Sequence, residues 1–237
     1  MNCRKIISAD LLKWIALITM FIDHIGAGII EKCDFSAPYM NQADIIIRGI
    51  GRLSFPIYCF LLVEGYRYTR SRWKYCLNLF IFALISEIPF DYMFRGKLTL
   101  DYQNVYFTLL LGLLLMIVAG EIENKEIKYG IVLEFVAAIG FGLLAELMHT
   151  DYNSWGVLLI FILFLTRNEK RWVMCLAGAV FMLTAESEYA GILAFVLILF
   201  YNAKRSGKIN KYVFYSLYPI HLAVYCGIRY LLMSYIL

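Results

Sequence analysis

The chain has 237 residues, of which 62% are hydrophobic and 17% are charged, and its mean hydropathy is +0.69. Ordinary soluble domains are about 45–50% apolar and about 25% charged, and a domain of this length could not hide so much apolar surface from water. The composition therefore excludes a soluble domain and predicts an integral membrane protein. The formal charge of +4 does not by itself indicate a nucleic-acid partner, because in a membrane protein the positions of the cations matter more than their sum.

Nine apolar segments separated by charged clusters predict nine transmembrane helices, since a span needs about 20 residues. In chain order these segments are 11–30, 45–66, 75–94, 105–120, 131–148, 154–166, 172–184, 189–201 and 212–236. The three segments between 154 and 201 are shorter than a usual span, so we expect tilt or local thinning of the bilayer there. The apolar runs are continuous, which favours an all-α, polytopic helix bundle over a barrel. We predict a single transmembrane domain over residues 1–237.

The distribution of Lys and Arg predicts the orientation of this bundle. With a cytoplasmic N-terminus, 15 of the 22 Lys and Arg residues fall in inside loops. Only Lys32, Arg95 and Lys97 fall in outside loops. Inside loops of membrane proteins carry an excess of cations, so this asymmetry supports nine spans with the N-terminus in the cytoplasm.

Two histidines lie within predicted spans, where ionisable groups are expensive and are candidates for function. Asp23-His24 is in the first span, and a histidine near neutral pH is a natural general base, with the carboxylate orienting its imidazole. His221 follows Tyr218-Pro219 in the last span, where proline frees a backbone carbonyl and bends the helix. His221 is therefore either part of a structural hydrogen-bond patch or a site residue.

Two pairs of opposite charge occur in the second and third spans. Arg48 and Arg52 are four residues apart and share a helix face, and so do Glu87 and Asp91. At about 1.5 Å per residue these groups, like His24, lie in the outer half of the bilayer, and Asn104 joins the same layer at the start of the fourth span. We expect a polar chamber open toward the outside. The alternative is that these charges only form interhelical ion pairs that fix the register of the bundle.

The densest cationic cluster lies between the second and third spans, on the cytoplasmic side, and consists of Arg67, Arg70, Arg72 and Lys74. One interpretation is an anchor that contacts anionic lipid. The other is a phosphate-binding rim for a nucleotide-like cofactor, because arginine guanidinium groups suit phosphate. The scattered cysteines suggest no disulfide framework, and we expect no metal site.

Seven short segments occur in an order that resembles the TraX family of integral membrane proteins, which is known for N-acetylation of conjugative pilin. They are LKWIA (12–16), MFIDHIG (20–26), RGIGRLSFP (48–56), LVEGY (62–66), SEIPFD (86–91), NVYFT (104–108) and FYSLYPIH (214–221). The region 121–184 carries little of the pattern. TraX proteins are similar to a broader group of transmembrane acyltransferases that includes the lysosomal glucosamine N-acetyltransferase and bacterial O-acyltransferases.

The resemblance implies an acyl-CoA-dependent acetyltransferase in the plasma membrane, expected to be the inner membrane of a bacterium. Acetyl-CoA would be the co-substrate, entering from the cytoplasm, and the acceptor would be an amine or hydroxyl of a pilin-like N-terminus or an envelope glycan. In the broader group a histidine in an early helix is the essential base, and the matching position is His24.

The other roles follow from the physical chemistry of the residues. CoA phosphates would bind the cationic cluster, and Arg48, Arg52 or Asn104 would stabilise the oxyanion of the tetrahedral intermediate. Glu87 and Asp91 would hold those arginines or bind the acceptor, and we place His221 and Tyr218 with the substrate-binding residues. Direct transfer and an acetyl-histidine intermediate fit equally well.

Three other functions remain open from the residues alone. A secondary transporter of a small polar solute also needs buried ionisable groups, although no internal repeat is visible. A non-catalytic assembly partner in envelope biogenesis is another alternative. A haem protein with His24 and His221 as axial ligands is a weak third, because two lone histidines are not specific.

Overall fold

The computed structural model describes residues 6–32, 38–204 and 210–236. Within these ranges all the regular elements are helices, and the only β-type pairings are the isolated bridges Ile7–Tyr201 and Gln103–Thr150. The elements are α1 (Ala9–Ile25), η1 (Gly26–Ile30), α2 (Pro38–Gly51), α3 (Ser54–Tyr68), α4 (Arg72–Phe94), α5 (Val105–Asn124), α6 (Gly130–Leu147), α7 (Asn153–Leu165), α8 (Arg171–Met182), η2 (Glu186–Gly191), α9 (Ile192–Leu199) and α10 (Lys211–Ile236). The predicted all-α class is confirmed.

The nine predicted segments reappear as helices in the described part of the chain, and the second of them is divided into α2 and α3. The division falls at Arg52 and Leu53. Pro56 explains it, because a proline lacks the N–H of a regular helix turn and its ring clashes with the carbonyl four residues earlier, here that of Arg52. A new helix that starts at Ser54 places Pro56 in its first turn, where this loss is tolerated.

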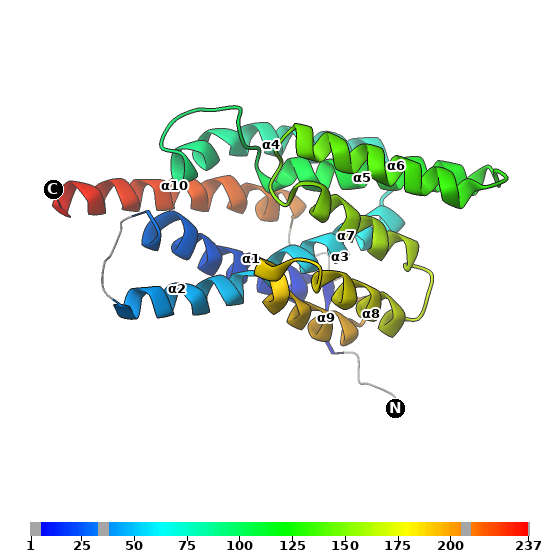
Figure 1. Cartoon of the computed structure of the whole chain (residues 1–237), viewed down its shortest axis with the longest axis horizontal. Coiled ribbons are helices and arrows are strands. Elements are labelled where there is room, and N and C mark those ends of the chain that lie inside the picture. Colours follow the sequence, from blue (N-terminus) through cyan, green and yellow to red (C-terminus); the bar gives the residue numbers. More distant parts are fainter. Residues whose placement is uncertain (1–5, 33–37, 205–209, 237) are drawn as a thin grey trace. The chain divides into compact units, whose positions relative to one another are not determined.

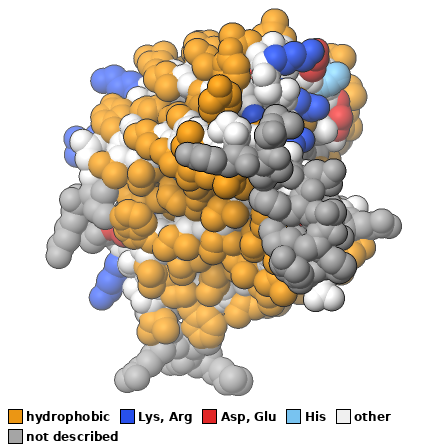
Figure 2. All heavy atoms as spheres, turned by 90° about the vertical axis from the view of Figure 1, so that its left-hand side faces the viewer, with side chains coloured by type: hydrophobic (Ala, Val, Ile, Leu, Met, Phe, Trp, Pro, Cys, Tyr) orange, Lys and Arg blue, Asp and Glu red, His pale blue; other side chains and the backbone are white. Residues whose placement is uncertain are grey.

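Five helical stretches of the described chain are long and apolar enough to cross a membrane. They are Ala9–Ile30, Gln42–Tyr68, Arg72–Phe94, Val105–Asn124 and Gly130–Leu147. The helices over Asn153–Leu165, Arg171–Met182 and Glu188–Leu199 are apolar but shorter, as the sequence predicts. Apolar side chains cover most of the described surface in Figure 2, as expected for helices whose outer faces meet lipid. The protein is therefore a membrane protein, and the cytoplasmic position of its N-terminus stays a prediction.

The chain forms two compact units. The first contains the described residues of Met1–Tyr58, Ile88–Leu98 and Cys175–Leu237, and the second contains Cys59–Glu87 and Thr99–Met174. In the first unit α1 packs against α2 and α10 (Figure 1). The short helix η2 packs against α2 and α9. In the second unit α5, α6 and α7 pack against one another.

Glycines bring α1 and α2 close together in the first unit. A Cβ added to Gly51 would collide with the carboxyl group of Asp23, and one added to Gly26 would lie 2.8 Å from Cδ of Arg48 and 2.7 Å from Oδ1 of Asp44. Small residues at such positions let helix backbones approach in a membrane bundle. The close approach places polar side chains of both helices within contact distance.

The second unit is built round α5, whose side chains are mostly buried. Leu113, Leu115 and Met116 are fully buried, and a Cβ at Gly112 would collide with Ile160 of α7. Asn104 starts this helix as its N-cap, and its Oδ1 accepts a hydrogen bond from the backbone N–H of Tyr106 at 3.1 Å.

Candidate functional site

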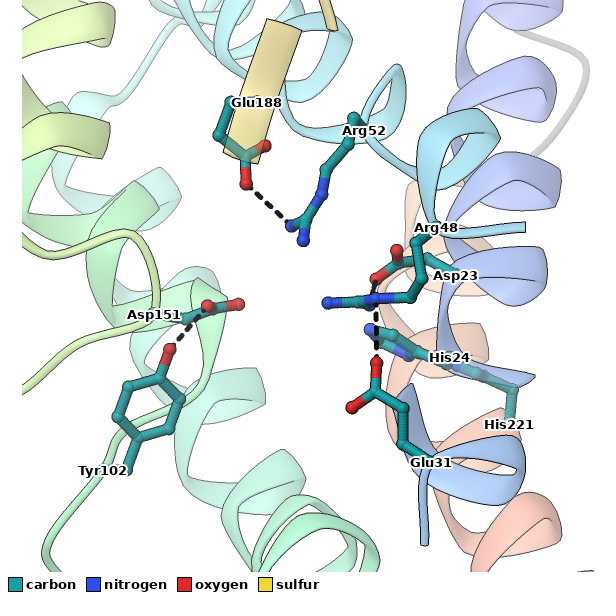
Figure 3. Close-up of polar contacts among 9 residues, drawn as sticks. All are labelled: Asp23, His24, Glu31, Arg48, Arg52, Tyr102, Asp151, Glu188 and His221. Carbon is teal, nitrogen blue, oxygen red and sulfur yellow. Dashed lines mark hydrogen bonds and ion pairs between the residues drawn. The ribbon is translucent and has the colours of Figure 1, made fainter. Parts of the chain in front are cut away.

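The two predicted site histidines meet in the first unit. Nδ1 of His24 on α1 lies 2.6 Å from Nε2 of His221 on α10, although the two residues are 197 positions apart in the sequence (Figure 3). Nδ1 of His221 lies 2.9 Å from the carbonyl oxygen of Leu217 on the same helix. Metal–imidazole bonds are about 2.0–2.1 Å each, so a separation of 2.6 Å is a hydrogen bond and leaves no room for a shared iron. This contact argues against the haem alternative.

The rings meet edge to edge. Their planes are within 14° of each other and their centroids are 4.9 Å apart, nearly twice the distance between the two nitrogens. If the rings were stacked face to face with two nitrogens 2.6 Å apart, their centroids would be much closer than 4.9 Å. The two imidazoles therefore lie in nearly the same plane, which is the plane of the nitrogen lone pairs.

Aromatic rings surround this pair. Phe21 stacks on His221 with a centroid distance of 4.4 Å, and Phe94 contacts His24 edge-on at 5.5 Å. The ring of Tyr218 contacts both histidines, at 6.1 Å from His24 and 5.6 Å from His221. This apolar surrounding holds both imidazoles in one orientation and limits the access of water.

Arg48 joins α2 to the segment that carries His24. Its Nη1 lies 2.7 Å from Oδ2 of Asp23, and its Nε lies 3.2 Å from Oε1 of Glu31 (Figure 3). Glu31 directly follows the π-helical turn η1, whose first carbonyl accepts the Glu31 N–H at 3.0 Å. This turn is wider than an α-helical turn, and such turns are frequent at functional sites.

Arg52 has a different carboxylate partner. Its Nη1 lies 2.7 Å from Oε1 of Glu188 in η2, and Glu188 is 6% exposed. Asp23, which the sequence assigns to orient His24, is instead an ion-pair partner of Arg48, and the hydrogen-bond partner of His24 is His221.

The remaining predicted polar residues divide between the two units. Asp91 is buried in the first unit and Glu87 belongs to the second, so their shared role in holding Arg48 and Arg52 stays a prediction. In the second unit Nδ2 of Asn104 donates to the Ala83 carbonyl at 2.9 Å and to the Glu87 carboxylate. Both amide protons of Asn104 are thus used in joining α5 to α4, which favours the arginines over Asn104 as oxyanion donors.

The cationic cluster lies at the turn between α3 and α4, in the second unit. Arg67 donates to the Arg167 carbonyl at 3.0 Å, and Arg72 lies over the ring of Tyr66 at 4.3 Å. Arg70 and Lys74 are exposed, and no ion pair is found for either of them within the described ranges. Two cations of the cluster are therefore held by the protein, and two have their charge available to an anion.

Sequence reasoning missed Glu31, Glu188 and Asp44. Glu31 follows an apolar run and Glu188 lies between two short ones, so both suggested loop positions. The only sequence signal for a wider turn before Glu31 is the pair of glycines Gly26 and Gly28 directly after His24. Asp44 lies beside Arg48 on the first turns of α2, and its Oδ1 is buried.

The order of the motifs agrees with a family match. A family model described as TraX protein matches residues 8–229. The chain belongs to the TraX family. The matched range includes all the motifs named above and both histidines of the site, so the predicted resemblance is confirmed.

Two other proteins are similar to the chain. The chain is 30% identical over 251 residues to the probable fimbrial assembly protein FimC, serogroup H1, of Dichelobacter nodosus. This match covers 94% of this chain and 96% of that protein. It is 32% identical over 103 residues to an uncharacterised protein of Rickettsia prowazekii, strain Madrid E, covering 44% of this chain and 34% of that protein. No solved structure matches the chain.

Proposed function

We propose that this TraX-family protein is an integral membrane acetyltransferase that transfers the acetyl group of acetyl-CoA to the N-terminal amine of a pilin-like or fimbrial subunit. The observation that carries the proposal is His24, whose Nδ1 is hydrogen-bonded to His221 and whose Nε2 has no hydrogen-bond partner among the described residues. A histidine with one nitrogen fixed and the other available is the arrangement of a general base. The fimbrial name of the Dichelobacter nodosus relative supports a subunit of a surface filament as acceptor.

In this reaction His24 handles one proton. The acceptor nitrogen attacks the acetyl carbonyl, a C–N bond forms, and Nε2 of His24 takes a proton from that nitrogen. The C–S bond then breaks, and His24 returns the proton to the sulfur of CoA. The aromatic side chains round the histidine limit competing attack by water on the thioester.

The charges beside His24 favour an amine over a hydroxyl acceptor. Asp23, Glu31 and Glu188 supply three carboxylates to the two guanidinium groups of Arg48 and Arg52. An ammonium group is a cation with three donors, so it would compensate this excess, whereas a sugar hydroxyl would not.

The buried Oδ1 atoms of Asp23 and Asp44 lie against Gly51 and Gly26, so they add negative charge where α1 and α2 meet but are not open to a substrate. The acceptor would enter as an ammonium, lose one proton to water, and give the second to His24.

The oxyanion of the tetrahedral intermediate needs donors already aimed at it. Arg48 suits this task because carboxylates hold its guanidinium through Nη1 and Nε, and Arg52 is held in the same way by Glu188. For the donor substrate, the exposed Arg70 and Lys74 fit the phosphates of CoA, because neither charge is compensated by an ion pair among the described residues.

Acetyl transfer by the purified protein tests the proposal. The protein in detergent is mixed with acetyl-CoA labelled in the acetyl group and with a peptide bearing a free N-terminus, and labelled peptide is measured by mass spectrometry. We expect transfer by the wild type and a loss of about 10²–10⁴-fold for His24→Ala, because a general base contributes about that much. His149→Ala, which alters the third of the three histidines, is the matched control and should keep full activity.

Three results would contradict the proposal. The first is a wild-type protein that does not bind acetyl-CoA, and the second is full transfer by His24→Ala. The third is transfer to a glycan hydroxyl but none to the free N-terminus, which would overturn the amine acceptor. A peptide with a blocked N-terminus is the substrate control and should accept no acetyl group.

A further inference from the structure

The hydrogen bonds of the histidine pair fix the position of every ring proton. A carbonyl oxygen has no proton to give, so at the 2.9 Å contact Nδ1 of His221 donates to the carbonyl of Leu217. A neutral imidazole has one protonated nitrogen, so Nε2 of His221 is an acceptor. The 2.6 Å contact then requires that Nδ1 of His24 is the donor. The one ring nitrogen of this pair whose lone pair accepts no hydrogen bond from the other histidine is therefore Nε2 of His24.

The geometry of the rings agrees with this assignment. Because the two imidazoles lie within 14° of one plane and meet edge to edge, the N–H of His24 points along the lone pair of His221. Phe21 covers the face of His221 at 4.4 Å, and Tyr225 lies edge-on to it at 5.5 Å. His221 is 5% exposed, so its orientation is set by packing as well as by hydrogen bonds.

We infer that His221 is a positioning residue, which holds His24 as the Nδ1–H tautomer and so presents Nε2 of His24 to the substrate. This inference rests on the proposed function, in which His24 acts on the acceptor. His221 itself touches no reacting atom. It acts through His24, and when His24 takes the acceptor's proton, the Nε2 lone pair of His221 stabilises the resulting imidazolium.

The two hydrogen bonds from His24 to His221 and from His221 to Leu217 end at the Leu217 carbonyl. A backbone carbonyl does not pass a proton on, so the proton taken by Nε2 of His24 does not leave through His221. It returns from the same nitrogen to the CoA sulfur. The pair therefore orients and stabilises one base, and does not conduct protons away from it.

The tautomer is measured directly by NMR of the full-length protein labelled with ¹⁵N-histidine. The chain has three histidines, so the spectrum contains few signals, and His24→Gln, His149→Gln and His221→Gln assign them. In the wild type we expect His24 and His221 both to be protonated at Nδ1 and not at Nε2. A wild-type His24 protonated at Nε2 would overturn the inference, whether or not the protein transfers acetyl groups.

Two variants of His221 separate positioning from packing. His221→Leu fills space but accepts no hydrogen bond, so His24 loses its fixed tautomer and kcat should fall about 10²-fold or more, as when a base loses its orienting partner. In His221→Gln the side-chain oxygen reaches toward the former Nε2 and accepts the His24 N–H, which should restore at least a tenth of the wild-type kcat. KM for acetyl-CoA should change little in both variants.

The outcomes are distinguishable from failure of the proposed function. If the wild type shows the expected tautomer but transfers no acetyl group, the proposed function fails and the orientation of His24 stands. If His221→Leu keeps the wild-type kcat, or His221→Gln is no better than His221→Leu while both retain the wild-type melting temperature, His221 is not a positioning residue. His149→Gln is the control for histidine loss and should change neither kcat nor the two other signals.

Discussion

Arg48 illustrates how one side chain fixes the local arrangement of the site. Its guanidinium contacts Asp23, which precedes His24, and Glu31, which follows the π-helical turn, so one residue of α2 holds the chain on both sides of the histidine. Removing one partner of such a pair leaves the other charge partly buried without compensation. This destabilises a protein more than replacing both partners by apolar residues. The ion pairs of this unit are therefore as important for the position of His24 as for the charge of the site.

The cationic cluster gives a prediction at the residue scale. In the double variant Arg70→Gln/Lys74→Gln, KM for acetyl-CoA should rise about tenfold with little change in kcat, because two exposed cations without ion pairs among the described residues are available to phosphate. Steady-state kinetics in detergent measures both constants. Lys125→Gln/Lys128→Gln removes two cations from the turn between α5 and α6 and is the matched control.

The same pair of variants separates the two interpretations of the cluster. If Arg70 and Lys74 only contact anionic lipid, both double variants should have the wild-type KM for acetyl-CoA in detergent and should differ only in binding to anionic vesicles. An equal rise of KM in both double variants would indicate a general effect of charge and would contradict a specific phosphate site.

At the scale of helices, α2 offers two glycines with opposite surroundings. A Cβ at Gly51 would collide with the Asp23 carboxyl group, whereas a Cβ at Gly49 would meet no atom within 4 Å. Gly51→Ala should therefore displace Asp23 from Arg48 and destabilise the protein by about 1–3 kcal/mol. Gly49→Ala should be neutral or stabilising by up to about 1 kcal/mol, because alanine loses less conformational freedom in a helix.

Thermal unfolding of both variants in the same detergent checks this prediction, with acetyl transfer as a second measurement. We expect Gly51→Ala to lower both the melting temperature and kcat, since the shifted carboxyl group belongs to the residue next to His24. Equal melting temperatures for the two variants would show that α1 and α2 do not approach as closely at Gly51 as the structure has them.

At the scale of the whole molecule, the positive-inside distribution predicts the side of each loop. Nine spans and a cytoplasmic N-terminus place the C-terminus outside. Alkaline phosphatase fused after the last residue should therefore be active, and a fluorescent protein at the same point should be dark. A fusion in the turn between α5 and α6 should give the opposite pair of signals and serves as the internal control.

A C-terminal fusion that is fluorescent and lacks phosphatase activity would overturn the nine-span topology. The short apolar helices over Asn153–Leu165, Arg171–Met182 and Glu188–Leu199 would then be the first to re-examine, since each has fewer than 18 residues, whereas each of the five candidate spans has 18 or more. If one of these helices lay within the bilayer without crossing it, every later loop and the C-terminus would be on the opposite side of the membrane.

The sequence by itself determined the class of the protein and the helical segments, because hydropathy and helix breakers act over a few residues. The break between α2 and α3 was not predicted, because the segment 45–66 is interpreted as one helix, although Pro56 explains it. The motif order determined the family, and the presence of histidine beside aspartate in an apolar span singled out His24.

The partners of the site residues were decided only by the tertiary structure. The i,i+4 spacing predicts that Arg48 and Arg52 share a helix face, but Arg52 lies in the break after α2, and the spacing does not say which carboxylate each arginine meets. That choice depends on how closely α1 approaches α2 at Gly51 and on the extra width of the turn before Glu31. The bond between His24 and His221 joins residues 197 positions apart, and no local pattern encodes the rotation of two helices that makes their rings coplanar.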